Sequence, residues 1–547
     1  MQELQNAVQT VCKDLFNVDV DIVLTRPDEQ FGDYATNVAL QLSKQVGKNP
    51  REIAQAIAAK IRNNSPETIA DVSVAGPGFI NIRLTDAALI AAMDKQRQST
   101  DSQEVVIETN NPNPLKAMHI GHAFNAILAD TLANLIESTG AKTHRVSYHG
   151  DVGAHVGKSM YSLLNYVAGD VSKLTAIPEE DRNSFMSRMY AEGAAAYKED
   201  ETAKARIDEL SKQSFTRDDP LYASVYDTCK AWSFEQIDSI VALLGNKPIE
   251  RRYLESEADT LGVQTAQAHV PDVFKDIDGA LLFEGSKYGA FDNVFVSSTG
   301  RGLYAARDLG LMQLKNREYP EATKSYIVTA EEQRDYFKGV IKAAELCLPQ
   351  LTGITVNLST GTVKLSTGKM SSRSGDVLEI SWLFEQISQA IKARGGQASD
   401  AMISSALRYE FLKVRIGSDV IFDVGDAVAI QGNSGPYLQY AHARARSILA
   451  KTDTTAAPPT QLNPSERTLV RKLTEYPELV QHASQELLPH HICTYLYELA
   501  QTFNRFYEQN RVIADPQEAE RLTLVNKYAD VLRGGLDLLG ITAPERM

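Results

Sequence analysis

Residues 104–135 read EVVIETNNPNPLKAMHIGHAFNAILADTLANL, and this stretch decides the fold. It opens with a short apolar run that contains β-branched residues, Glu104–Glu108, which predicts a buried strand. The Asn- and Pro-rich residues 109–114 cannot continue a strand and predict a turn. From Ile120 onward the apolar residues recur at helical spacing. The stretch therefore predicts a strand, a tight turn and a helix whose first turn contains two histidines.

The start of this helix suits an anion such as phosphate, because a helix N-terminus has unpaired N–H groups and a partial positive charge. His119 and His122 are three residues apart and share one face, and Gly121 has no side chain to keep a flat ligand from the backbone. Two imidazoles there can donate hydrogen bonds to phosphate oxygens. Taken alone, H-x-x-H is better explained by a surface helix with two solvated histidines. A metal pair would need a third ligand, and none of the right kind is nearby.

A second motif follows roughly 250 residues downstream. Lys369, Met370, Ser371 and Ser372 lie in a short polar, basic segment between apolar ones. A lysine beside small hydroxyl residues can reach a triphosphate as a point charge, although the segment alone would be an ordinary solvated loop. The two motifs together, in this order, are specific. They resemble the HIGH and KMSKS motifs of class I aminoacyl-tRNA synthetases.

Composition indicates a globular protein of several domains. The chain has 547 residues with 43% apolar and 23% charged content, which is ordinary for soluble proteins. No run approaches the length of a membrane span, and the amphipathic start is unlike a signal peptide, so we expect no membrane association. The four cysteines are scattered and form neither a zinc spacing nor a disulfide framework, which favours the reducing cytoplasm.

The net charge of −14 is unexpected for a protein that binds nucleic acid. The negative charge is unevenly distributed along the chain, because the residues from Gln431 to the end include 12 basic and 13 acidic side chains and are nearly neutral. A near-neutral region can still present a basic face. The charge therefore neither proves nor excludes RNA binding.

The chain divides into three predicted parts. Residues 1–97 form a small α+β unit with helical patterns that include Ala35–Val46, and residues 94–103 read as a linker. Residues 103–380 form a doubly wound, Rossmann-like parallel sheet with a polar helical insertion at about 156–260. The sheet is expected to resume near Ala280–Phe283 and Val294–Val296. Residues 381–547 are almost all helix and predict a helical bundle. The fold class is thus multidomain α/β.

Several blocks together resemble one class I family, the arginyl-tRNA synthetases, and the resemblance covers the whole chain. The blocks are FGDYATN (31–37), AGPGFINI (75–82), IETNNPNPLKAMHIGH (107–122), GLYAARDLG (302–310), GKMSSRSG (368–375) and GPYLQYAHARAR (435–446). The resemblance implies ATP-dependent attachment of L-arginine to its cognate tRNA(Arg) through arginyl-adenylate, with release of pyrophosphate and AMP. It also implies Mg²⁺ on the nucleotide, without a dedicated protein metal site, and a monomer.

The resemblance assigns an arginine site to five residues, Glu108, Asn113, Tyr304, Asp308 and Gln333. The chemistry agrees, because a guanidinium is a planar fork of five donors without an acceptor, and carboxylates and an amide oxygen are its natural partners. A capping or salt-bridging role would explain each residue singly as well; the matched set favours the site.

The resemblance likewise assigns ATP binding to His119, Gly121, His122, Lys369, Met370, Ser371 and Ser372, and catalysis to His119, His122, Lys116 and Lys369. Which lysine dominates stays open. The family usually has Leu-Arg after the second histidine, where this chain has Ala123-Phe124, and an aromatic residue where it has Val152.

The predicted tRNA contacts are Phe31, Tyr34, Asn37, Tyr437, Tyr440, Arg444 and Arg505. The two aromatics of FGDYATN suit stacking on unpaired bases, although a capped helix start with core aromatics fits the local sequence equally well. Two other functions remain possible at this stage. One is a nucleotidyltransferase with the same sheet but no tRNA, which would need neither terminal part. The other is a tRNA-binding regulator without catalysis, which would not need both intact motifs.

Overall fold

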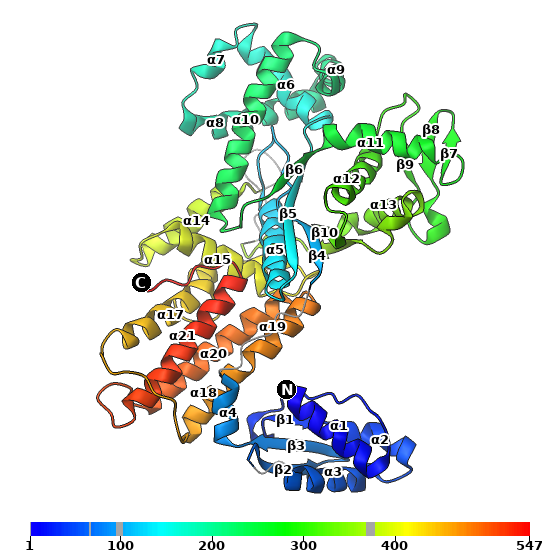
Figure 1. Ribbon diagram of the computed structural model, residues 1–547. Coiled ribbons are helices and arrows are strands. Elements are labelled where there is room, and N and C mark those ends of the chain that lie inside the picture. Colours follow the sequence, from blue (N-terminus) through cyan, green and yellow to red (C-terminus); the bar gives the residue numbers. More distant parts are fainter. Residues whose placement is uncertain (1, 65–66, 94–101, 368–377) are drawn as a thin grey trace.

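The computed structural model describes residues 2–64, 67–93, 102–367 and 378–547, and it has three parts (Figure 1). A small N-terminal unit (blue) lies at the bottom of Figure 1. A helical bundle (orange to red) lies between this unit and the parallel sheet with its helices. In the described residues no helix is both long and apolar enough to span a bilayer. The predicted fold class is confirmed.

The central sheet has five parallel strands in the order β11-β10-β4-β5-β6. Their bounds are β4 (Glu104–Glu108), β5 (Lys142–His149), β6 (Arg251–Leu254), β10 (Ala322–Ala330) and β11 (Thr355–Thr360). The chain winds outward in one direction from β4 and then in the other from β10. The carboxyl ends of β4 and β10 therefore form the switch point where such sheets bind ligands.

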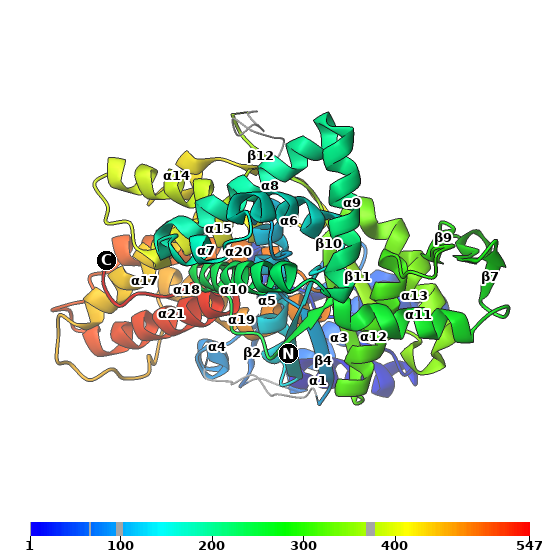
Figure 2. The same ribbon diagram turned by 90° about the horizontal axis from the view of Figure 1, so that it is seen from above.

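The prediction that this sheet resumes near Ala280–Phe283 and Val294–Val296 is wrong. These segments are β8 (Ala280–Phe283) and β9 (Asn293–Val296), which form a separate antiparallel sheet with β7 (Phe274–Ile277). Figure 2 shows this small sheet on the side of the molecule opposite the C-terminal helices. The parallel sheet instead takes β6, inside the range expected for the insertion. Its sequence, RRYL, has only Tyr253 buried, so an edge strand gave too weak an apolar signal.

The helices cover the sheet and build the other parts. The insertion contains α6 (Ala154–Val167), α7 (Ser172–Thr175), η2 (Glu179–Asp181), α8 (Arg182–Glu199), α9 (Glu201–Thr216) and α10 (Pro220–Leu243). The sheet carries α5 (Ile120–Glu137), α11 (Glu255–Ala268), η3 (Gly285–Tyr288), α12 (Tyr304–Glu318), η4 (Glu331–Gln333), α13 (Arg334–Cys347) and η5 (Pro349–Leu351). The C-terminal part contains α14 (Ile380–Ala393), α15 (Asp400–Leu412), α16 (Val424–Ala427), α17 (Gly435–Leu449), α18 (Pro464–Thr474), α19 (Tyr476–Gln485), α20 (Pro489–Gln509) and α21 (Glu518–Leu538). A two-stranded parallel sheet, β12 (Val363–Leu365) with β13 (Val420–Phe422), joins the last two parts.

The N-terminal unit packs helices on the antiparallel sheet β1-β3-β2. Its elements are α1 (Gln2–Phe16), η1 (Glu29–Phe31), β1 (Tyr34–Thr36), α2 (Val38–Val46), α3 (Pro50–Asn64), β2 (Ile69–Ala75), β3 (Phe79–Leu84) and α4 (Asp86–Met93). The predicted helix at Ala35–Val46 starts too early, because Ala35 pairs with Asn81 of β3 and belongs to the sheet. The helix begins only after Asn37, its N-cap.

Helix α5 connects the sheet to the C-terminal helices, and Arg408 of α15 fixes this connection. Arg408 has 0% of its surface exposed. Its guanidinium donates hydrogen bonds to Asp130 (2.9 Å) and Thr131 (3.1 Å) on α5, to Leu244 O (2.9 Å) and Asn246 (2.7 Å) after α10, and to Leu539 O (2.6 Å) near the C-terminus. A buried guanidinium needs such partners, and here they come from three separate segments.

Candidate active site

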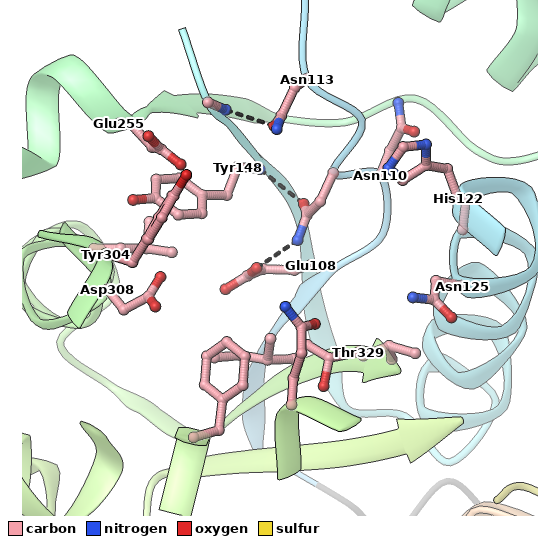
Figure 3. Close-up of a pocket in the computed structure, with 18 of the residues that line it drawn as sticks. Glu108, Asn110, Asn113, His122, Asn125, Tyr148, Glu255, Tyr304, Asp308 and Thr329 are labelled. Atoms are coloured by element: carbon pink, nitrogen blue, oxygen red, sulfur yellow. Dashed lines mark hydrogen bonds between the residues drawn. The ribbon is translucent and has the colours of Figure 1, made fainter. Parts of the chain in front are cut away.

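A cavity of about 510 Å³ lies at the carboxyl ends of β4 and β10, at the switch point of the sheet (Figure 3). Its wall comes from the turn after β4, from α5, from the start of α11 and from α12, η4 and α13. In Figure 3 Glu255, Tyr304 and Asp308 lie on one side, His122, Asn110 and Asn125 lie on the other, and Glu108 lies between them. The cavity thus has an acidic side and an imidazole-and-amide side.

The two histidines form a reciprocal cap at the start of α5. His119 is the N-cap, its Nδ1 accepts the backbone N–H of His122 (3.4 Å), and Nδ1 of His122 accepts the backbone N–H of His119 (3.3 Å). The rings stack with their centres 3.6 Å apart. A ring nitrogen that accepts a hydrogen bond carries no proton, so in each neutral ring the proton is on Nε2. Each ring therefore keeps an outward N–H donor.

Both imidazoles are held neutral. Burial, with help from the nearby Lys116 ammonium, lowers the pKa of His119 to about 4. Burial, the His119 ring and Lys116 lower the pKa of His122 well below its usual value. A Cβ at position 121 would lie 3.2 Å from the His119 ring, so Gly121 also keeps that ring in place. The pair can donate to phosphate oxygens without changing its protonation near neutral pH.

We call Glu108, Glu255 and Asp308 the acid wall. Glu108, at the end of β4, is 3% exposed and accepts hydrogen bonds from the Lys315 ammonium (2.6 Å) and from the Asn111 amide (2.7 Å). Glu255 accepts one from Arg307 (2.8 Å). Asp308 accepts one from the neutral Tyr336 hydroxyl (2.5 Å).

Asp308 differs from the other two carboxylates in its proton affinity. Burial, with smaller contributions from the neighbouring Glu255 and Glu108, raises the pKa of Asp308 to about 7, against the opposing effects of the Tyr336 hydrogen bond and Lys315. Burial also raises the pKa of Glu255, although Arg307 opposes it. A cation that enters the cavity would favour the ionised form of Asp308.

The structure brings together the five residues predicted for arginine. Glu108, Asn113, Tyr304, Asp308 and Gln333 all line the same cavity, and His122 lines it too. Asn113 accepts the backbone N–H of Gly150 (2.8 Å), which fixes the amide at the rim. His119 and Lys116 lie outside the cavity wall; the Lys116 ammonium is 5.8 Å from the centre of the Tyr190 ring in the insertion. Lys369, Met370, Ser371 and Ser372 lie outside the described residues.

Sequence reasoning missed several residues of the cavity wall. Asn110 is 2% exposed, and neither its amide nitrogen nor its amide oxygen has a hydrogen-bond partner among the described residues. The buried hydroxyls of Thr109 and Tyr148 are also unpartnered there. Buried polar groups are normally paired, so these atoms indicate that the cavity receives a polar ligand. The Asn-rich turn at residues 109–114 contains a signal for the first two, but of this turn the family resemblance assigns only Asn113 to the site.

Three family models match the chain: "Arginyl tRNA synthetase N terminal domain" over residues 2–84, "tRNA synthetases class I (R), catalytic domain" over 85–405 and "DALR anticodon binding domain" over 438–547. The catalytic model covers more than half of the chain. This chain belongs to the arginyl-tRNA synthetase family. The class of ligase predicted from the sequence is therefore confirmed.

Relatives of the synthetase match it along nearly its whole length. An arginine–tRNA ligase of Frankia casuarinae is 30% identical over 96% of this chain and 94% of that protein. One of a Synechococcus species is 27% identical over 96% and 95%. The solved structure of Thermus thermophilus arginyl-tRNA synthetase covers both chains completely with a TM-score of 0.83 at 24% identity, which shows the fold.

The predicted tRNA contacts of the synthetase lie in two places, the N-terminal unit and the C-terminal helices. Those in the N-terminal unit differ in exposure. Phe31 is 49% exposed and Asn37 is exposed, so both can meet a partner. Tyr34 is only 5% exposed, because its hydroxyl donates to Glu478 of α19 (2.6 Å) and the Arg26 guanidinium covers its ring at 4.0 Å. The expectation that Tyr34 stacks on a base is thus contradicted, and the residue instead holds the N-terminal unit to the bundle.

The C-terminal group lies on α17 and α20. Tyr440 and Arg505 are exposed, Tyr437 accepts a hydrogen bond from Asn504 (3.1 Å), and the Arg444 guanidinium lies 4.9 Å from the Tyr507 ring. Aromatic rings and arginines on neighbouring helices are the chemistry that binds unpaired bases and phosphates.

The contrast between Tyr34 and Phe31 can be tested. We expect Tyr34→Phe to lower the free energy of unfolding by about 1 kcal/mol, since it removes hydrogen bonds but keeps the ring. It should leave the KM for tRNA unchanged. Phe31→Ala should raise that KM roughly 5- to 150-fold, the loss of one stacked base. Urea unfolding and aminoacylation kinetics measure the two effects. Equal increases in KM would show that Tyr34 also meets tRNA.

Proposed function

We propose that the synthetase binds L-arginine in the cavity of Figure 3 and joins it to tRNA(Arg) in two steps. In the first step a carboxylate oxygen of arginine attacks the α-phosphorus of ATP, and pyrophosphate leaves. In the second step a ribose hydroxyl at the tRNA 3′ end takes the arginyl group from the adenylate, and AMP leaves. The observation that carries the proposal is that the acid wall and His122 of α5 border one cavity.

The acid wall suits the guanidinium end of the substrate. Asp308 accepts hydrogen bonds from the guanidinium in its ionised form, while Glu108 and the Gln333 amide oxygen offer further acceptors. Tyr304, at the start of α12 and 62% exposed, can cover the bound side chain. Asn113 at the rim suits the α-amino end. A neutral or apolar analogue would leave these acceptors unpaired, at roughly 1–3 kcal/mol for each buried group.

The start of α5 suits the nucleotide. The outward Nε2–H donors of His119 and His122 and the positive end of the helix stabilise the charge that develops on the phosphates. Lys116 adds a cation close to both rings, and we propose that Lys369 adds another, with Gly121, Met370, Ser371 and Ser372 completing the nucleotide site. Catalysis then consists of positioning and charge stabilisation, without a covalent enzyme intermediate.

ATP use follows from the family, and we propose that Mg²⁺ accompanies the nucleotide. In the described residues no group of three or more His, Cys, Asp or Glu side chains is arranged to hold a metal ion. Mg²⁺ commonly binds through substrate phosphates and keeps several waters, so the histidine and lysine side chains here fit phosphate rather than metal. When bound, the ion neutralises part of the phosphate charge.

We propose that the three predicted parts share the tRNA. Residues 1–97 bind its bent corner through Phe31 and Asn37, residues 103–380 with the insertion at about 156–260 carry the reaction, and residues 381–547 read the anticodon. Tyr437, Tyr440, Arg444 and Arg505 supply the last contact. We also propose that the protein acts as a monomer in the cytoplasm; its four buried free cysteines suit a reducing compartment.

The affinity for arginine should depend on pH through Asp308. Because the pKa of this carboxyl is about 7 in the empty cavity, it is increasingly protonated below pH 7 and must lose the proton to pair with the guanidinium. We expect the dissociation constant of arginine to rise about 10-fold per pH unit below pH 7 and to be constant above it. Titration calorimetry from pH 5.5 to 8.5 measures this. The KM for ATP is the control, since His119, with a pKa of about 4, does not titrate in that range.

Arginine-dependent exchange of pyrophosphate into ATP tests the function, with and without cognate tRNA. Exchange with arginine but not with citrulline or lysine supports the proposal. No exchange under either condition overturns it.

A further inference from the structure

The acid wall has a built-in charge balance. Glu108 is paired with the Lys315 ammonium and Glu255 with the Arg307 guanidinium, whereas Asp308 has, among the described residues, only the neutral Tyr336 hydroxyl as a side-chain partner. Two of the three carboxylates are therefore compensated by the protein itself. One wall carboxylate is left for a ligand, and a guanidinium carries one positive charge.

We propose that Lys315 is a positioning residue that acts through Glu108 and limits the arginine site to one uncompensated carboxylate. This inference rests on the proposed function and adds the determinant of the site's charge. Buried charges must be paired, and two carboxylates that share a site without a cation hold on to a proton. Lys315 removes that competition, so that the substrate guanidinium binds without first displacing a tightly held proton.

Lys315 is placed to act on Glu108 and not on the substrate. On α12 the residues Tyr304, Asp308, Leu311 and Met312 line the cavity, and Lys315 is the next residue on that face. It is only 3% exposed and is absent from the cavity wall. It lines a second, smaller cavity together with Val106, Met312 and Ala322. The ammonium reaches up to Glu108 at 2.6 Å.

Further charged and titratable groups surround the acid wall, but the carboxylates of Asp259 and Asp151 do not line the cavity. The titratable and charged groups of the wall and its surroundings are Arg307, Asp308 and Lys315 on α12, Glu255 and Asp259 on α11, Asp151 before α6, Tyr148 on β5, Tyr336 on α13 and Glu332 on η4. Asp259 shares the Arg307 guanidinium with Glu255 (3.0 Å), and Asp151 accepts from Ser256 (2.9 Å) and Tyr226 (3.1 Å). Glu332 is exposed, so water screens it.

The test measures the dissociation constant of L-arginine for the full-length protein by calorimetry from pH 6 to 9. In the wild type the constant should level off above about pH 7, where Asp308 is ionised. In Lys315→Met, Glu108 and Asp308 share a site without a cation and retain a proton to higher pH. The levelling-off should move above about pH 8, with binding at least about fivefold weaker at pH 7 and a much smaller loss at pH 9.

Two matched variants separate charge from packing. Lys315→Arg keeps a cation and should level off near pH 7. The double variant Glu108→Gln/Lys315→Met removes both members of the pair and should also level off near pH 7, with weaker binding from the lost carboxylate. If Lys315→Met does not fold, the double variant decides: levelling off elsewhere overturns the proposal.

The remaining outcomes are also decisive. Binding by Lys315→Met that is weakened equally at every pH would show that Lys315 only supports packing, and would refute its proposed role. Failure of the wild type to bind arginine at any pH would remove the proposed function itself.

Discussion

Asp308→Asn should abolish efficient use of arginine while the protein stays folded. The substitution keeps the shape of the side chain and the contact with Tyr336, but removes the one wall carboxylate without a built-in cation. Truncating one partner of a desolvated, hydrogen-bonded charge pair costs about 2–5 kcal/mol. We therefore expect kcat/KM for arginine in pyrophosphate exchange to fall roughly 30- to 5,000-fold. The dependence on pH near 7 should vanish as well.

Two controls sharpen this experiment. Glu332→Gln removes an exposed carboxylate from the rim of the same cavity, and kcat/KM should change by less than about fivefold, since water screens such charges. Tyr336→Phe keeps Asp308 but removes its donor, so the pH at which arginine binding levels off should rise above about 7. If Asp308→Asn affects kcat/KM no more than Glu332→Gln does, Asp308 does not bind the guanidinium.

His122→Ala should slow activation without weakening the binding of arginine or tRNA. The substitution removes an Nε2–H donor at the positive end of α5, where we place the phosphates. Loss of one donor that stabilises transition-state charge typically reduces kcat by about 10²- to 10³-fold. Single-turnover formation of arginyl-adenylate measures that rate, and filter binding measures the affinity for tRNA. Equal losses in both would argue against a role at the phosphates.

The reciprocal cap provides a second check on the histidines. Because each ring accepts the other's backbone N–H, replacing either one also removes a cap worth about 1 kcal/mol of stability. The double variant His119→Ala/His122→Ala should therefore lose less activity than the product of the single losses, since the pair acts as one unit. Independent losses would indicate that only one ring faces the nucleotide.

The local part of the fold could be predicted from the sequence because local signals determine it. The strand Glu104–Glu108, the turn and the helix that follows are all present in the structure as predicted. The five residues that the matched motifs assign to arginine line one cavity. In each case the composition of a short stretch, or its match to a family block, was enough.

The remainder depended on partners that are remote in the sequence. Tyr34 is buried by Glu478, which lies 444 residues further along the chain, and no local pattern contains that contact. Lys315 pairs with Glu108, which lies 207 residues away in the sequence. Nothing in the local sequence distinguishes this lysine from any other lysine in a helix. Strand β6 was missed because an edge strand with two arginines has little apolar signal.

The position of Arg408 has a practical consequence for anyone who engineers this enzyme. Leu539 O, directly after α21, accepts a hydrogen bond from the same guanidinium that binds Asp130 in the middle of α5. Removing residues 538–547 would delete this acceptor and leave the Arg408 guanidinium, which holds the helix that begins with the two histidines, with fewer partners. The catalytic part therefore cannot be separated from the C-terminal helices.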